Sequence, residues 1–203
     1  MIRPAEPGDL DALLAVYASA RAYMCLHGNP SQWGDDYPSP ALLEEDIRRG
    51  RLYVDTDERG AVHGAFAFLP GDDPTYARIE GGSWLSDAPY GVIHRVASDG
   101  RMPGVFRRCA AFCRARCANL RIDTHHDNHT MQRLIEGAGF RRCGVIYVED
   151  GSPRIAYQTP CPWPLPPVGQ NGDSSVTPAP IPKDWGPFSI PAPPARPAPG
   201  HGR

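Results

Sequence analysis

The stretch GVIHRVASDGRMPGVFRRCAAFCRARC, residues 91–117, contains the signals of a strand, a tight loop and a helix in succession. Residues 92–97 form a short, largely apolar run of strand length, and Ser-Asp-Gly at 98–100 ends it. From residue 105 onward apolar side chains recur every four positions among arginines, which predicts an amphipathic helix that packs on a sheet. The loop before such a helix presents unpaired backbone N–H groups and the positive end of the helix dipole. This pattern favours an anionic group such as phosphate, although a plain strand-to-helix connection looks the same in sequence.

Composition divides the 203 residues into two parts. Fourteen of the 24 prolines lie at or after Pro160, which argues against regular structure in that region. We therefore expect one domain over residues 1–159 and a proline-rich, disordered tail over residues 160–203.

Charge and hydropathy exclude several classes of partner. The formal net charge of −2 and the pI near 6.4 provide no basic field of the kind that binds nucleic acid. The N-terminus lacks a secretion signal, and no apolar run approaches the roughly 18 residues that cross a bilayer. We therefore expect a cytoplasmic protein without nucleic-acid or membrane partners. The six cysteines are then reduced core residues, and Cys109 and Cys117, roughly 12 Å apart along a helix, cannot bind one zinc ion.

Periodicity along the chain predicts alternating strands and helices in the order β α α β β β α β α β β, a mixed sheet with helices on its faces. Asp9 and Ser39 are the expected N-caps of the first two helices, and Asp127 or Asn128 caps the last. In the mixed region between the third and fourth of these strands, residues 76–80 are a candidate extra strand. The expected main strands cover residues 2–4, 52–54, 62–69, 92–97, 120–124, 145–148 and 155–158.

This element order, the loop-to-helix segment after the fourth main strand, and Asn128 with Gly139-Phe140 near the later helix resemble the GNAT superfamily of N-acetyltransferases. The segments QWGDDYP, GVIHR, RIDTH and YVEDGSPRIAYQ are similar to a bacterial subgroup of that family. The resemblance covers residues 1–159 and implies an α/β fold. Its mixed, mostly antiparallel sheet has six or seven strands and about four flanking helices, and its fourth and fifth strands splay apart.

The resemblance also implies acetyl-coenzyme A as co-substrate, with its pantetheine arm between the splayed strands and its pyrophosphate on the loop before the helix. The family's loop pattern of Arg or Gln, two residues, Gly, one residue and Gly or Ala places Arg101 and Gly104 in register. Phe106 occupies the last small position, and Pro103 provides no backbone N–H donor. The expected cofactor contacts are Val96, Ala97, Arg101, Gly104, Val105 and Asn128.

Acetyl transfer to an amine requires a neutral amine, donors for the thioester carbonyl oxygen and a proton for the departing thiolate. His94 and His125 are candidate bases because imidazole titrates near working pH, and Glu80 is an outside candidate. His94 as a hydrogen-bonded core residue is the open alternative. Ile135 stands where the family often has a tyrosine acid, so Tyr147 is the expected substitute. A thiol pKa of about 8.5 also allows the thiolate to leave without an acid.

Three aromatic residues in irregular segments are candidate acceptor-binding residues. Trp33 and Tyr37 belong to the loop over residues 27–38, and Trp84 belongs to residues 70–89. The two aromatic residues of the loop over residues 27–38 either form a binding wall or cover one end of the core. The expected function is direct acetyl transfer, in a ternary complex, to a primary amine of a small molecule, peptide or protein. The sequence leaves open whether the protein forms a homodimer.

Two other functions remain open from the sequence. The altered loop allows a coenzyme A-binding sensor or interaction module without turnover. Asp123 and His125, with neighbouring histidines, allow a metal-dependent enzyme. The period of a strand turns Asp123 and His125 to one face and His126 away, and Asp127 is better used as a helix cap. We therefore expect no metal.

Overall fold

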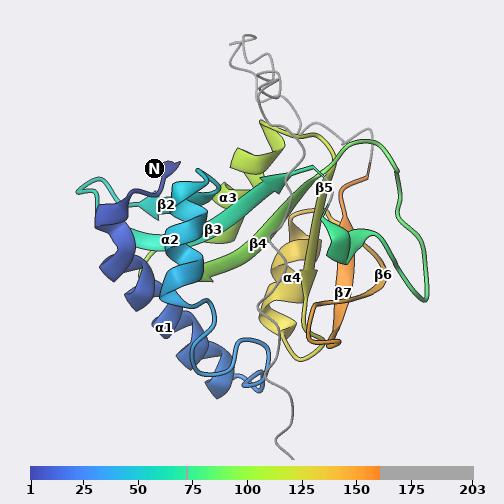
Figure 1. Cartoon of the computed structure of the whole chain (residues 1–203), viewed down its shortest axis with the longest axis horizontal. Coiled ribbons are helices and arrows are strands. Elements are labelled where there is room, and N and C mark those ends of the chain that lie inside the picture. Colours follow the sequence, from blue (N-terminus) through green and yellow to red (C-terminus); the bar gives the residue numbers. More distant parts are fainter. Residues whose placement is uncertain (72, 161–203) are drawn as a thin grey trace, which may run out of the picture.

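The computed structural model describes residues 1–71 and 73–160 (Figure 1), and of the tail predicted over residues 160–203 all but the first residue lies outside them. The strands are β1 Ile2–Pro4, β2 Leu52–Thr56, β3 Val62–Pro70, β4 Gly91–Ser98, β5 Leu120–Thr124, β6 Arg141–Tyr147 and β7 Pro153–Gln158. The helices are α1 Leu10–Leu26, α2 Pro40–Arg48, α3 Val105–Arg114 and α4 His129–Gly137, with short 3-10 helices η1 Pro7–Asp9 and η2 Pro74–Tyr76. The predicted element order is confirmed.

The strands form one seven-stranded sheet in the order β1-β2-β3-β4-β5-β7-β6, in which β4 and β5 pair in parallel and the other neighbours pair antiparallel. This confirms the predicted mixed, mostly antiparallel α/β fold. Among the described residues, no helix is both long and apolar enough to cross a membrane.

Helices cover both faces of the sheet (Figure 1). On one face Leu13 and Tyr17 of α1 and Leu43 of α2 form a core with small side chains of β2, β3 and β4. On the other face Phe106 of α3 and Ile135 of α4 pack with larger apolar side chains of the sheet. Burial of these two apolar layers supplies most of the stabilisation that the fold requires. The thiols of Cys109, Cys113, Cys117 and Cys143 are free and buried, as predicted for core cysteines, whereas Cys25 is free but exposed, which corrects the prediction for that residue. Cys161 lies outside the described residues.

The helix boundaries follow the sequence signals at most ends. The Ser39 hydroxyl caps α2, and Asn128 caps α4 by accepting a hydrogen bond of 3.0 Å from the backbone N–H of Met131. Asp9 precedes α1 but does not cap it, which corrects the sequence prediction. Its carboxylate instead accepts hydrogen bonds from Arg3, because the charged guanidinium is the stronger partner.

The candidate strand at residues 76–80 is wrong. Its first residue ends η2, and Asp73 caps that short helix by accepting a hydrogen bond of 2.9 Å from the backbone N–H of Thr75. Glu80 alone pairs with a strand, in an isolated antiparallel bridge to Val145. Pro74 favours the first turn of a helix at this point. The strand prediction relied on the alternation of side chains alone and did not take this proline into account.

The two parallel strands separate after a short paired segment. Pairing of β4 with β5 covers Gly91–Ile93 against Leu120–Ile122, although β4 continues to Ser98. The separation begins at a bulge, where β4 has one residue more than its partner segment of β3 and Arg95 adopts a φ of 52°. A positive φ is uncommon for a residue other than glycine, so the surrounding contacts must hold this backbone in place.

Candidate functional site

A groove of about 1880 Å³ opens where β4 and β5 separate. Its lining includes the loop between α1 and α2, the later half of β4, the N-terminus of α3, and part of β5 and α4. Val96 and Ala97, predicted to contact the cofactor, lie on β4 in this lining, and Ile122 and Asp123 line it from β5. The splayed strands thus leave room for an extended ligand between them.

The N-terminus of α3 lies at one end of the groove. Gly104 precedes the helix with a φ of 76°, and no side chain from the described part of the chain caps it. The first helical N–H groups therefore remain available to an anion. Gly104 and Val105 line the groove as predicted, whereas the Arg101 side chain is 81% exposed and does not. Phe106 lies in the first turn of α3 and its side chain is buried in the core between this helix and the sheet, so its bulk does not occupy the loop.

The loop before α3 is organised by its own side chains. Asp99 accepts a hydrogen bond of 2.9 Å from the backbone N–H of Arg101, and Ser98 accepts one of 3.1 Å from that of Gly100. Asp99 also contacts Nδ1 of His63 at 2.8 Å. This hydrogen bond raises the pKa of His63 above its ordinary value, although partial burial opposes the shift.

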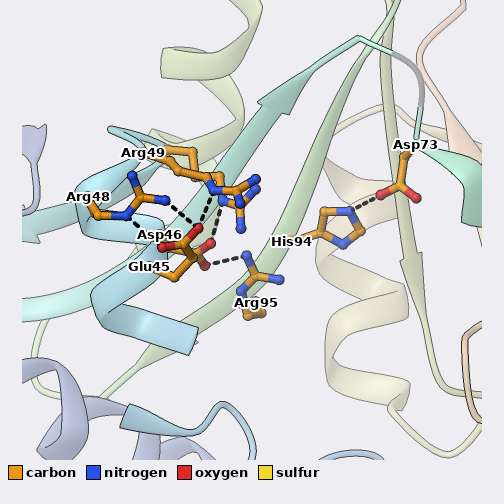
Figure 2. Close-up of polar contacts among 8 residues, drawn as sticks. Glu45, Asp46, Arg48, Arg49, Asp73, His94 and Arg95 are labelled. Atoms are coloured by element: carbon orange, nitrogen blue, oxygen red, sulfur yellow. Dashed lines mark hydrogen bonds and ion pairs between the residues drawn. The ribbon is translucent and has the colours of Figure 1, made fainter. Parts of the chain in front are cut away.

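His94 and Asp73 form a hydrogen-bonded pair on the wall of the groove (Figure 2). His94 Nε2 lies 2.9 Å from Asp73 Oδ2, and both side chains are largely buried. Burial acts to raise the pKa of Asp73, but the hydrogen bond and charge of His94, with the Thr75 contact, hold it below its ordinary value. His94 is therefore hydrogen-bonded, as expected of a core histidine, and it also borders the groove, so its catalytic role stays a prediction.

Asp73 and Tyr76 also belong to this site, although they were not predicted from the sequence. The Tyr76 hydroxyl donates a hydrogen bond of 2.5 Å to Asp123, and its ring meets that of His94 edge-on at 5.9 Å between centroids. Burial is the main cause that raises the pKa of Tyr76, and the Asp123 carboxylate adds to it. The only sequence signal was the turn chemistry around Asp73, which indicates a cap and not a partner for a histidine.

Glu80 and Tyr147, predicted as base and acid, are not part of the groove lining. The Tyr147 hydroxyl donates a hydrogen bond of 3.1 Å to Glu80, and this contact is the main cause that raises the pKa of Tyr147. Glu80 also pairs with Arg78 at 2.5 Å. The structure brings these two predicted residues to each other but not to His94.

His125 lies beyond the end of β5, also outside the groove lining. Burial is the main cause that lowers its pKa below the ordinary value of histidine. The prediction that His126 turns away is wrong, because the two rings are 4.1 Å apart between centroids. The strand has ended at residue 124, so its alternation no longer applies. Potential ligand atoms of His125, His126 and Asp127 lie within 4.8 Å of one another, whereas Asp123 is bonded to Tyr76.

Asn128 lines the groove, and its amide group is held from two directions. Its oxygen caps α4, and its nitrogen donates a hydrogen bond of 2.9 Å to Gln32 of the loop between α1 and α2. The residue therefore ties this loop to the helix beside the groove.

Of the predicted acceptor-binding aromatics, Trp33 and Tyr37 line the groove and Trp84 does not. Trp33 lies between Tyr17, at 5.8 Å, and Tyr37, at 6.1 Å between ring centroids. Trp84 stacks on Tyr76 from outside and donates a hydrogen bond of 3.1 Å to its carbonyl oxygen. Trp84 thus packs against the small core under η2 and not on the groove, where an acceptor-binding residue was expected.

The sequence matches no model of a known protein family and no curated protein. Its structure is similar to that of a GNAT-family acetyltransferase from Streptococcus agalactiae, with 29% identity, a TM-score of 0.66, and coverage of 78% of this chain and 94% of that one. A GNAT-family acetyltransferase from Listeria monocytogenes shares the fold at 19% identity and a TM-score of 0.57, over 78% of this chain and 93% of that one.

A GNAT-superfamily phosphinothricin acetyltransferase from Sinorhizobium meliloti, in complex with AcCoA, shares the fold at 17% identity and a TM-score of 0.50, over 79% of this chain and 87% of that one. These similarities extend over nearly the whole described domain, and the streptococcal protein adds sequence identity to the shared fold. The chain therefore has the fold of GNAT-superfamily acyltransferases, and its 29% identity to the streptococcal acetyltransferase supports membership of that superfamily.

Proposed function

We propose that the protein transfers an acetyl group from acetyl-coenzyme A to a primary amine, directly and in a ternary complex. The observation that carries this proposal is the groove itself, which connects the separated strands β4 and β5 with the uncapped N-terminus of α3. The complex of the similar Sinorhizobium meliloti protein with AcCoA supports the choice of acyl donor.

The residues at the groove fit coenzyme A. The first N–H groups of α3 would bind the pyrophosphate, and Gly104 allows a close approach because its position carries no side chain. The separated part of β4, with Val96 and Ala97, would hold the pantetheine arm and offer a backbone N–H to the carbonyl oxygen. When bound, acetyl-coenzyme A supplies the acetyl group as an activated thioester.

His94 is the proposed general base, and Asp73 is the residue that orients its ring. When Nε2 donates its proton to Asp73, Nδ1 carries the lone pair that takes a proton from the amine. Trp33 and Tyr37 border the same groove and are the proposed wall of the acceptor site. Tyr147, Glu80 and His125 have no part in this proposal, since they lie outside the lining.

The cofactor site is tested by calorimetric titration with acetyl-coenzyme A of the wild type and the Gly104→Trp variant. We expect binding in the wild type and its loss in the variant, because the indole would fill the place of the pyrophosphate. Gly60→Trp is the matched control, since Gly60 has a similar φ of 84° and lies outside the groove lining. Absence of binding in the wild type, or equal binding in both variants, would contradict the proposed site.

The base is tested by following thiol release from acetyl-coenzyme A with a panel of primary amines. His94→Gln should slow transfer by roughly 10²- to 10⁴-fold, the usual contribution of a positioned general base. Asp73→Asn should retain cofactor binding and alter the pH profile of the rate, because it changes the partner of the imidazole without removing it. Cofactor binding without thiol release for any amine would favour a coenzyme A-binding module without turnover.

A further inference from the structure

One wall of the groove carries more positive charge than its protein partners neutralise. Arg49, Arg51 and Arg95, here called the arginine cluster, line this wall. Two carboxylates face four guanidinium groups in the surrounding network, which leaves a formal excess of two positive charges. The members of the network are Glu45, Asp46, Arg48, Arg49, Arg51 and Arg95.

The carboxylates are shared within this network, and none belongs to a single arginine. Asp46 is fully buried and accepts hydrogen bonds from Arg95 and, at 2.5 Å, from Nε of Arg51. Glu45 pairs in the same way with Arg49, at 2.5 Å, and with Arg48. The Arg48 side chain is 69% exposed and lies outside the lining, so one of the two excess positive charges remains with the three arginines that line the groove.

Arg95 is the most enclosed member of the cluster. Its side chain is 10% exposed, and its Nε is buried without a hydrogen-bond partner in the described part of the chain. Burial acts to lower the pKa of Arg95, but Tyr37 and Asp46 hold it above the ordinary value, so the charge persists. A buried guanidinium with an unused donor is costly unless an acceptor reaches it.

The opposite wall of the groove is acidic. Asp73 and Asp123 line it, and His94 lies between Asp73 and Arg95 in Figure 2. His94 and Arg95 are consecutive on β4, so the proposed base and the arginine cluster are neighbours. The groove therefore offers carboxylates for a cation beside His94 and a guanidinium group for an anion at Arg95, the next residue of the strand.

We propose that the acceptor is a primary amine that also carries a carboxylate, with the dimensions of a free amino acid. This inference rests on the proposed function and specifies its substrate. Arg51 and Arg95 bind the carboxylate, for which the planar guanidinium fork is suited, and the amine lies at His94 near the acidic wall.

The test is calorimetric titration of the full chain, saturated with coenzyme A, with L-alanine, L-methionine, L-phenylalanine and L-glutamate, each against its α-carboxamide. At least one amino acid should bind about ten- to a hundredfold more tightly than its amide, the range for hydrogen bonds to a charged group. Arg51→Met should abolish this difference. Arg48→Met should retain it, because Arg48 belongs to the same network but lies outside the lining.

If the wild type binds the amino acids and their α-carboxamides equally, or binds none of the amino acids, the inference is overturned, whatever the variants show. Tighter binding of phosphoethanolamine than of every amino acid would assign the anion site to phosphate and also overturn it. Titration with acetyl-coenzyme A separates the two proposals. Loss of that binding contradicts the proposed function, whereas intact binding without a carboxylate preference contradicts only the present inference.

Discussion

The hydroxyl of Tyr17 holds the bulge of β4, and its removal should destabilise the domain measurably. Tyr17 is fully buried in α1, and its hydroxyl donates a hydrogen bond of 2.9 Å to the carbonyl oxygen of Arg95. Arg95 is the residue with a φ of 52°, in the segment where β4 leaves the sheet ladder. Tyr17→Phe removes the donor and leaves the ring in place.

The expected loss in the free energy of unfolding is about 1–3 kcal/mol, the cost of removing the donor from this part-buried hydrogen bond and leaving its acceptor unsatisfied. For a domain of this size, about 1 kcal/mol lowers Tm by roughly 2–4 °C, so the expected shift is about 2–12 °C. Acetyl transfer should also slow. The backbone N–H of Val96, beside Arg95, is the proposed hydrogen-bond donor to the thioester carbonyl oxygen, and it would lose its fixed position.

Urea denaturation of the wild type and the variant measures this loss, provided that both show the same m-value. Tyr23→Phe is the matched control, since Tyr23 also lies in α1 but is 45% exposed, with its hydroxyl 3.2 Å from Thr130 Oγ1. That change should stay within about 0.5 kcal/mol. If Tyr17→Phe is as stable as Tyr23→Phe, this hydrogen bond does not hold the bulge, and the reasoning is refuted.

Two further predictions concern stability. The pKa of His63 is raised mainly by its hydrogen bond with Asp99, so protonated His63 stabilises the folded state. This stabilisation is complete below the unfolded pKa of about 6.5 and is lost as pH rises through the folded pKa. Urea denaturation at a series of pH values should therefore show the advantage of the wild type over His63→Gln shrinking with rising pH, and a constant advantage would argue against the pair. Gly82→Ala should cost more than about 2 kcal/mol, because the new Cβ would lie 1.9 Å from the Cys143 carbonyl oxygen. Gly8→Ala, with nothing within 4 Å, should cost less than about 0.5 kcal/mol in the same assay.

Local signals predicted the elements well because those signals act within a few residues. The hydroxyl of Ser39 and the proline after it specify the start of α2 whatever the rest of the chain does. The same holds for α3. The apolar period predicts this helix, and Gly104 allows the left-handed backbone conformation that precedes it. The strand predicted at residues 76–80 failed because alternation over a few residues is weak and a proline-started turn precedes it.

The site was predicted only in part, because its contacts join residues far apart in the chain. His94 was identified from its strand, but its partner Asp73 lies 21 residues away, in a segment with mixed local signals. The pairing of Tyr76 with Asp123 spans 47 residues, and no pattern within a window of helical or strand length reports such a contact. Glu80 and Tyr147 were predicted from their side-chain chemistry alone. Their hydrogen bond to each other, across 67 residues of sequence, could not be predicted from local patterns.

The topology explains why the proposed phosphate site and the proposed thioester site lie together. A parallel pair of strands requires a crossover connection, and here α3 crosses between β4 and β5. The helix in such a connection begins after the carboxyl end of its first strand, so the N-terminus of α3 must lie near the end at which β4 and β5 separate. The bulge at Arg95 adds the separation, and residue 94 immediately before it carries the proposed base. The single strand β4 therefore provides the backbone of the proposed cofactor groove, the proposed base and one residue of the arginine cluster. It follows that a substitution which straightens the bulge should impair cofactor binding, proton transfer and acceptor recognition together, whereas substitutions in the arginine cluster outside β4 should impair acceptor recognition alone.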